Sequence, residues 1–149
     1  MDRTLKVNGN SGCRSAQPVD SDFYNVYFGL GHGLKLIDNS KVFKVSPAGA
    51  AFGSLLVRHF QRESSSQRFL DVGTGSGVHA LLLRSMGVSA VTATDVSGVA
   101  VAVAKRNEIN NFGVGAIDFV IGNLFDGVLS GESKYDVILF NPPGVESSR

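Results

Sequence analysis

The apolar positions of residues 46–149 change period along the chain, in the order that an α/β domain requires. Short apolar runs of strand length alternate with longer stretches whose apolar residues have helical spacing. The predicted strands are Arg68–Val72, Ala90–Asp95, Ile117–Ile121 and Tyr135–Phe140. The predicted helices run from Ser46 and Pro47 to about Arg62, from Val78 to Met86, and from Ser97 to Asn111. Because parallel neighbours need crossover connections, this order predicts a parallel sheet with helices on both faces.

The third predicted helix has the least regular pattern. Its valines at positions 99, 101 and 103 alternate with alanines, which alone would favour a strand. Ser97 suits a helix N-cap, and the charged residues that follow the valines contain no turn-forming sequence. We therefore expect a helix, which ends at Gly113.

Residues 1–45 differ in pattern from the rest of the chain. Residues 1–20 are rich in Ser, Asn and Gly, which predicts a mobile arm. Residues 21–45 hold the aromatic run Phe23–Phe28, the apolar run Leu34–Ile37 and a short extended piece, Val42–Val45. We expect these runs to form a small β-hairpin cover that packs on the main domain, residues 46–149.

Composition narrows the class of protein. The length of 149 residues suits one globular domain, and 43% of the residues are hydrophobic. A formal net charge of +1 does not demand nucleic acid or an anionic membrane as partner. No apolar run reaches the roughly 18 residues of a spanning helix, and the single Cys13 indicates a reducing compartment. We expect a cytoplasmic protein that binds no membrane, and no metal, because its histidines and cysteine lack ligand spacing.

A glycine-rich loop follows the first predicted core strand directly. Gly73, Gly75 and Gly77 stand at every second position, and the predicted helix begins at Val78. Glycine allows a tight turn and a close approach of backbone to ligand, and a helix N-terminus offers free N–H groups. This strand–loop–helix predicts a nucleotide-like ligand at the carboxyl ends of the strands.

The loop alone leaves two cofactor classes open. The dinucleotide fingerprint is G-x-G-x-x-G, but here the third glycine comes one place early, and Val78 stands where the fingerprint wants glycine. Asp95 ends the second strand and could accept both ribose hydroxyls, which dinucleotide and adenosyl cofactors share. A nicotinamide dinucleotide domain therefore remains an alternative at this point.

The fourth predicted strand ends in Asn141-Pro142-Pro143, which places a carboxamide at the tip of a buried strand. The Asn141 oxygen can accept one N–H of a planar amide or amine, and the carbonyl of Pro142 can accept the second. Held in this way, the nitrogen directs its lone pair at an electrophile without a strong base. The same residues could also form a plain strand-ending turn.

Together these motifs resemble class I S-adenosylmethionine-dependent methyltransferases. The resemblance rests on Asp71–Gly77, Asp95, Gly122–Phe125 and Asn141–Pro143, and it covers about residues 42–144. More narrowly, the motifs resemble the HemK-like, small-domain group. That group includes glutamine methyltransferases of peptide release factors and N-methyltransferases of ribosomal components and of adenine. The resemblance implies a Rossmann-like sheet and S-adenosylmethionine as cofactor.

The resemblance also implies a role for each motif residue. The implied cofactor-binding residues are Asp71, Gly73, Gly75, Gly77, Asp95, Val96, Asn123 and Leu124. Asn141 and Pro142 are the implied catalytic residues that grip the acceptor nitrogen. The substrate-binding residues are expected to be Asn141, Pro143 and Phe43.

Three features depart from the family pattern. Position 123 is Asn instead of the usual Asp, and position 144 is Gly where an aromatic residue often stacks on the acceptor. Stacking would then come from Phe43 or Tyr27. The chain also stops at Arg149, just after the fourth strand, so we expect a sheet that is incomplete at its C-terminal side. Val137, Ile138 and Leu139 would be poorly covered, which invites a partner chain or self-association at this strand.

The leading hypothesis is an S-adenosylmethionine-dependent N-methyltransferase that acts on a planar amide or amino nitrogen. The acceptor could be a protein glutamine, an RNA or DNA base, or a small molecule. One alternative is a truncated, non-catalytic module that binds the cofactor or a partner. The nicotinamide dinucleotide domain is the other alternative.

Overall fold

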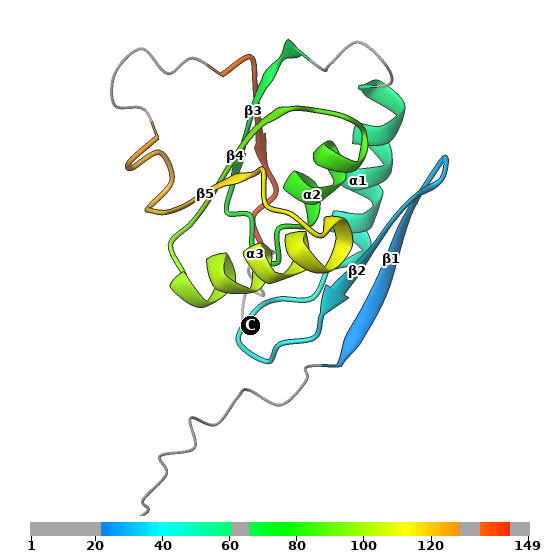
Figure 1. Cartoon of the computed structure of the whole chain (residues 1–149), viewed down its shortest axis with the longest axis horizontal. Coiled ribbons are helices and arrows are strands. Elements are labelled where there is room, and N and C mark those ends of the chain that lie inside the picture. Colours follow the sequence, from blue (N-terminus) through cyan, green and yellow to red (C-terminus); the bar gives the residue numbers. More distant parts are fainter. Residues whose placement is uncertain (1–21, 61–65, 129–134, 144–149) are drawn as a thin grey trace, which may run out of the picture.

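The structure is a computed structural model that describes residues 22–60, 66–128 and 135–143. The predicted arm of residues 1–20 and the predicted departure at Gly144 lie outside these described residues. The elements are shown in Figure 1 and are, in chain order, β1 (Phe23–Gly29), β2 (His32–Ile37), α1 (Pro47–His59), β3 (Arg68–Val72), α2 (Val78–Ser85), β4 (Ala90–Asp95), α3 (Gly98–Phe112), β5 (Asp118–Ile121) and β6 (Val137–Phe140).

The central sheet has the strand order β5–β4–β3–β6, and all its neighbouring strands are parallel. The register pairs Val72 of β3 with Thr94 on one side and with Phe140 on the other. The carboxyl ends of the strands therefore meet at one edge of the sheet. The predicted bounds of β3 and β4 are confirmed, and β5 and β6 begin slightly later than predicted.

Side-chain caps explain where the helices begin. The Ser46 hydroxyl accepts a 3.0 Å hydrogen bond from the Gly49 N–H, and Pro47 occupies the first turn of α1. The Ser97 hydroxyl accepts a 3.2 Å bond from the Ala100 N–H at the start of α3, and Gly113 ends that helix. The helical prediction for the alternating valines is confirmed. Helix α1 ends at His59, before the predicted end near residue 62, which is not among the described residues.

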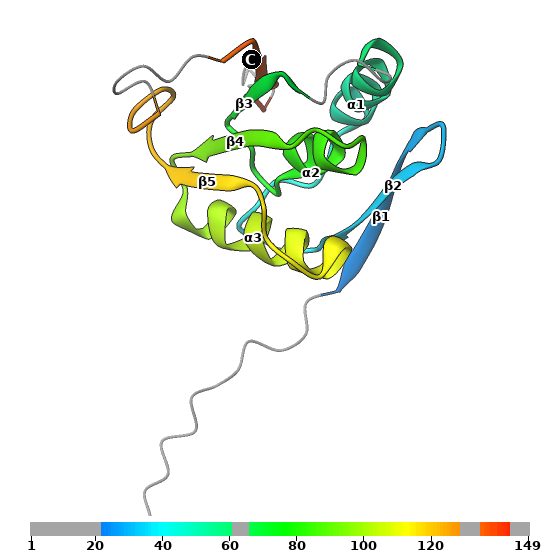
Figure 2. The same cartoon turned by 45° about the horizontal axis from the view of Figure 1, so that its top comes forward.

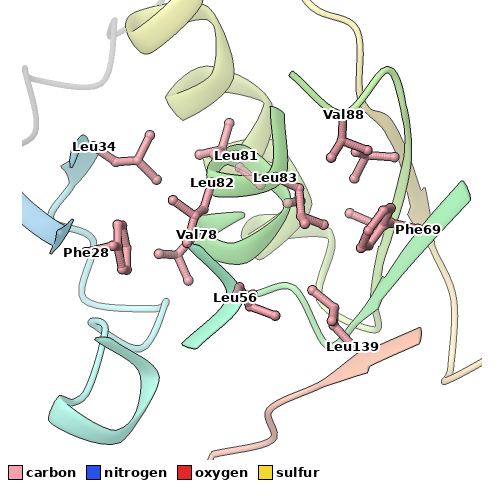
Figure 3. Packing of buried hydrophobic residues seen from close by; sticks show 14 of the residues in the cluster. Phe28, Leu34, Leu56, Phe69, Val78, Leu81, Leu82, Leu83, Val88 and Leu139 are labelled. Carbon is pink, nitrogen blue, oxygen red and sulfur yellow. The ribbon is translucent and has the colours of Figure 1, made fainter. Parts of the chain in front are cut away.

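Three layers make up the molecule: the parallel sheet, the helices, and the β1–β2 hairpin (Figures 1 and 2). Helix α2 lies in the middle, and Leu81, Leu82 and Leu83 are fully buried. Figure 3 shows Phe28 and Leu34 of the hairpin on one side of α2 and strand side chains on the other. One apolar core thus joins all three layers.

The predicted hairpin cover is confirmed. Strands β1 and β2 pair antiparallel, and the hairpin packs on all three helices. The approach to α1 is close, because a Cβ on Gly53 would lie 2.4 Å from the Phe28 ring. The third extended piece, Val42–Val45, has no ladder partner among the described residues.

The second face of the sheet is covered differently. Leu70 and Val72 of β3 pack there with Val128, which follows β5, and no helix of the described ranges joins this cluster. Helices were predicted on both faces of the sheet. Within the described residues, all the helices lie on one face. No helix in the described part of the chain is long and apolar enough to cross a membrane.

Among the strands of the described residues, β6 lies at the edge of the sheet, as predicted. Ile138 and Phe140 are 50% and 56% exposed on the second face. The expectation that Leu139 is poorly covered was wrong, because its side chain is only 4% exposed. The register pairs Leu139 with Asp71, so it faces the helices and joins the main core.

Candidate active site

The glycine loop between β3 and α2 is open on its outer side. Gly73 and Gly75 have φ angles of +70° and +56°, and a Cβ on either would meet no atom within 4 Å. Glycine is therefore required there by backbone conformation, while the space above the loop is free for a ligand. Gly77 differs, because its Cβ would lie 2.9 Å from the Cβ of Ala104. That glycine lets α2 pack against α3.

Asp71 lies beneath the loop and is 2% exposed. One of its oxygens accepts a 2.6 Å hydrogen bond from the Thr74 hydroxyl. Burial raises the pKa of the Asp71 carboxyl above its ordinary value of 3.8, although the charge of His79, the Thr74 hydroxyl and the Ala80 N–H oppose the shift. In this position, the carboxylate holds the shape of the loop and the first turn of α2.

Asp95 joins the end of β4 to the glycine loop. Its two oxygens accept 2.9 Å hydrogen bonds from the Gly75 N–H and the Ser97 N–H. Each carboxylate oxygen has a further lone pair, so the partly buried side chain can still accept hydrogen bonds from vicinal hydroxyls. Asp95 therefore fits the predicted ribose contact.

Two exposed apolar side chains stand near Asp95. Val96 is 73% exposed, and Leu124, which follows β5, is 51% exposed. The loop after β5 is tied to β4, because the Thr94 hydroxyl donates to the Leu124 carbonyl at 3.1 Å and the Gly122 N–H donates to the Asp95 carbonyl at 3.0 Å.

Asn123, next to Leu124, is exposed as well. A flat ring could therefore lie between the two apolar side chains, with the Asn123 amide at its rim.

Asn141 lies beside the glycine loop. It follows Phe140, which pairs with Val72, and Gly73 follows Val72 on the neighbouring strand. The Asn141 side chain is half-buried against the first turn of α1, where a Cβ on Gly49 would lie 3.4 Å from Asn141 Nδ2. The sheet thus brings Asn141, which is predicted to bind the acceptor, to the same edge as the residues that are predicted to bind the cofactor.

Pro142 and Pro143 are exposed after Asn141. The Phe43 side chain is 81% exposed and belongs to the segment that precedes α1. Two residues later, Val45 lies near the same glycine as Asn141, because a Cβ on Gly49 would be 3.4 Å from Val45 Cγ1 and 3.4 Å from Asn141 Nδ2. Tyr27 instead lies near the hairpin turn, where its hydroxyl accepts a 3.2 Å bond from the Gly31 N–H.

Sequence reasoning missed two residues that support the loop. Thr74 fixes Asp71, and Asn107 of α3 donates to the Ser76 carbonyl at 2.9 Å. His79 is buried as well, and its Nε2 lies 3.0 Å from the Gly49 carbonyl oxygen. The available signal was a polar side chain on an otherwise apolar helix face, which demands a buried partner.

Comparison with known proteins assigns the family. The family described as methyltransferase small domain matches residues 34–149. A ribosomal protein L11 methyltransferase of Fusobacterium nucleatum is 31% identical over 113 residues, which cover 70% of this chain and 35% of that protein. A putative protein N5-glutamine methyltransferase of Methanocaldococcus jannaschii is 30% identical over 117 residues, or 78% of this chain and 54% of that protein. The chain thus spans about a third to a half of the length of these relatives.

A solved structure has the same fold. It is the 16S rRNA N2 G1207 methyltransferase of T. thermophilus in complex with AdoMet and guanosine, with a TM-score of 0.71 and 21% identity. The match covers 85% of this chain and 34% of that one. Since the family match spans most of the sequence, the protein belongs to the methyltransferase small-domain family and has the class I, Rossmann-like methyltransferase fold.

Proposed function

We propose that this chain is the catalytic part of an S-adenosylmethionine-dependent N-methyltransferase. The observation that carries the proposal is the place of Asn141, beside Gly73 at the carboxyl edge of the sheet. An amide there can hold an acceptor nitrogen next to the open glycine loop. Membership of the methyltransferase small-domain family favours this reading over a nicotinamide dinucleotide domain.

The residues present fit the cofactor. The open backbone of Gly73 and Gly75 would lie along its methionine part, and the free lone pairs of Asp95 would accept its ribose hydroxyls. Val96 and Leu124 would flank the adenine, and the amide oxygen of Asn123 would accept its amino N–H. The bound cofactor supplies a methyl group on a positively charged sulfur.

The acceptor side is formed by the end of β6. The Asn141 Oδ1 and the Pro142 carbonyl would each accept one N–H of the acceptor, which turns the nitrogen lone pair toward the methyl group. The methylated nitrogen is acidic and loses its proton to water, so no strong side-chain base is required. Phe43 is exposed enough to stack on a flat acceptor, and Pro143 would border the same space.

The proposed arrangement of Asn141 and Pro142 suits a planar amide or amino nitrogen as the acceptor. Two relatives are a ribosomal protein L11 methyltransferase and a release factor glutamine methyltransferase, both of Fusobacterium nucleatum. A protein side-chain amide is therefore the first acceptor to test, before an RNA or DNA base or a small molecule.

The deciding experiment has a binding arm and a transfer arm. Titration calorimetry with S-adenosylhomocysteine should give heat of binding that Asp95→Ala removes. Incubation with radiolabelled S-adenosylmethionine and cell extract should then label protein or RNA, and Asn141→Ala should abolish the label while binding S-adenosylhomocysteine normally. Binding without any transfer would instead support a non-catalytic cofactor-binding module. That alternative is kept because the chain spans only part of the length of its relatives.

We also propose that a second copy of this chain, or else a partner chain, pairs with the outer edge of β6. Ile138 and Phe140 are half exposed there, next to a strand edge that pairs only with β3 among the described residues. Light scattering should detect self-association of the wild type that Phe140→Ser reduces; identical masses for both proteins would exclude self-association through this face.

A further inference from the structure

We infer that His79 is a positioning residue, which places the Asn141 carboxamide relative to the cofactor loop by clamping the first turn of α1. The inference rests on the proposed function only for its effect on methyl transfer. Its structural part concerns three groups that follow one another in space: the His79 ring, the Gly49 backbone and the Asn141 amide.

The first link is the contact between His79 and Gly49. His79 is the second residue of α2, directly after the glycine loop, and its side chain is 4% exposed. Its Nε2 lies 3.0 Å from the Gly49 carbonyl oxygen, so Nε2 carries the proton and donates. The Phe52 ring meets the imidazole edge-on at 5.0 Å, which restricts its rotation.

The second link is the closeness of Gly49 and Asn141. A Cβ placed on Gly49 would lie 3.4 Å from Asn141 Nδ2, so the carboxamide lies about one side-chain atom away from the backbone of α1. Within residues 22–60, 66–128 and 135–143, no hydrogen bond holds the Asn141 side chain. Its polar atoms therefore stay available for an acceptor, and the nearby turn of α1 at Gly49 limits the space in which it can move.

The third link ties His79 to the base of the cofactor loop. The buried Asp71 carboxylate accepts a hydrogen bond from the backbone N–H of Ala80, the residue that directly follows His79 in α2. Thr74 of the loop donates to the same carboxylate. His79 therefore lies between the loop that would hold the cofactor and the helix turn that positions Asn141. A shift of that turn by about an ångström would misplace the acceptor nitrogen, which can lower a rate by about a hundredfold.

The test compares His79→Gln with His79→Asn. The Gln amide nitrogen reaches the place of Nε2 and can donate to the Gly49 carbonyl, whereas the shorter Asn amide cannot. Both variants are polar and of moderate size, so they carry similar costs of burial. His79→Leu removes the donor altogether. The matched control is His32→Leu, because His32 contacts Ser85 at 3.0 Å near the other end of α2.

Two readouts are measured on the full chain. The first is the side-chain NH₂ signal of Asn141 in ¹⁵N–¹H NMR spectra, which should shift in the Asn and Leu variants and return in the Gln variant. The second compares affinity for S-adenosylhomocysteine with label transfer from S-adenosylmethionine to cell extract. The Asn variant should keep its affinity within about threefold and lose transfer by about 10- to 100-fold, while the Gln and His32→Leu variants keep both.

Failure of the inference is distinct from failure of the proposed function. If the wild type transfers no label, the NMR readout still decides whether His79 positions Asn141. Unchanged Asn141 signals in the Asn variant would overturn the inference, and so would an equal loss in the Gln and Asn variants. A loss of cofactor affinity as large as the loss of transfer would also overturn it, because His79 would then act on the loop alone.

Discussion

Gly75 and Asp95 are joined by a 2.9 Å hydrogen bond from the glycine N–H to the aspartate carboxylate, across 20 positions of sequence. The bond closes the end of β4 onto the glycine loop. The other carboxylate oxygen accepts the Ser97 N–H before α3. One side chain thus orders the loop and the helix start on both sides of the proposed ribose site.

Replacing Asp95 should therefore weaken cofactor binding in steps. Asp95→Asn keeps one acceptor oxygen but turns an NH₂ toward the second backbone donor, and Asp95→Ala removes both acceptors. Titration with S-adenosylhomocysteine should show a loss of about tenfold for Asn and about a hundredfold for Ala, at roughly 1.4 kcal/mol per tenfold. Asp118→Asn, at the exposed start of β5, is the control. Equal affinity of Asp95→Ala and the wild type would refute the ribose role.

Alanine substitutions at two glycines can distinguish the effect of backbone strain on stability from the effect of a Cβ on cofactor binding. Gly75 and Gly113 both have positive φ angles, +56° and +76°, and a Cβ on either meets nothing within 4 Å. Alanine at each position should cost about 1–2 kcal/mol of unfolding free energy, because an L residue is strained there. Only Gly75→Ala should also lower affinity for S-adenosylhomocysteine. Similar affinities in the two variants, measured by calorimetry, would mean that the cofactor does not lie along Gly75.

The sequence predicted the regular elements well where local signals agree. Strands β3 and β4 end in the residues that begin the loops, and Ser46 and Ser97 cap helices as expected. The alternating valines of α3 show the limit of periodicity alone, because the cap and the absence of turn residues decide the structure. Local chemistry was therefore sufficient to predict the order of the elements and to place the proposed site residues at one edge of the sheet.

Contacts between distant residues could not be predicted in this way. The pair of His79 and Gly49 is 30 residues apart, and the pair of Asn107 and Ser76 is 31 residues apart. Neither pairing follows from spacing, since it depends on how α1 and α3 pack on α2. Leu139 shows the same limit, because its burial depends on the register of β6 with β3.

The buried Asp71 predicts a pH dependence of stability. Burial is the largest cause of its raised pKa, so the folded state binds this proton more tightly than the unfolded state. The contribution to stability is fully present below the unfolded value of 3.8 and is lost as pH rises through the raised pKa. Asp71→Asn cannot ionise and should lack this loss. Urea unfolding from acid to neutral pH should show the wild type losing free energy relative to the variant; a constant difference would contradict the assignment.

Asn107 links the hairpin to the glycine loop, and its replacement should therefore lower the stability of both. Its fully buried amide accepts a 2.9 Å bond from the Ile37 N–H of β2 and donates to the Ser76 carbonyl of the loop. Asn107→Leu keeps the branched shape of the side chain but leaves both backbone groups unpaired, which should cost about 2–4 kcal/mol of unfolding free energy. The neighbouring Asn111 makes similar bonds to Lys35 at the surface, where water can replace them.

Asn111→Ala is therefore the matched control and should cost less than about 1 kcal/mol. Urea titration gives the unfolding free energies of the two variants, and hydrogen exchange shows which backbone amides lose protection. In Asn107→Leu, the amides of β2 and of the loop at Ser76 should exchange faster together, because one side chain links them. Faster exchange in β2 alone would mean that the hairpin and the loop are independent, and that the hairpin does not help to shape the cofactor site.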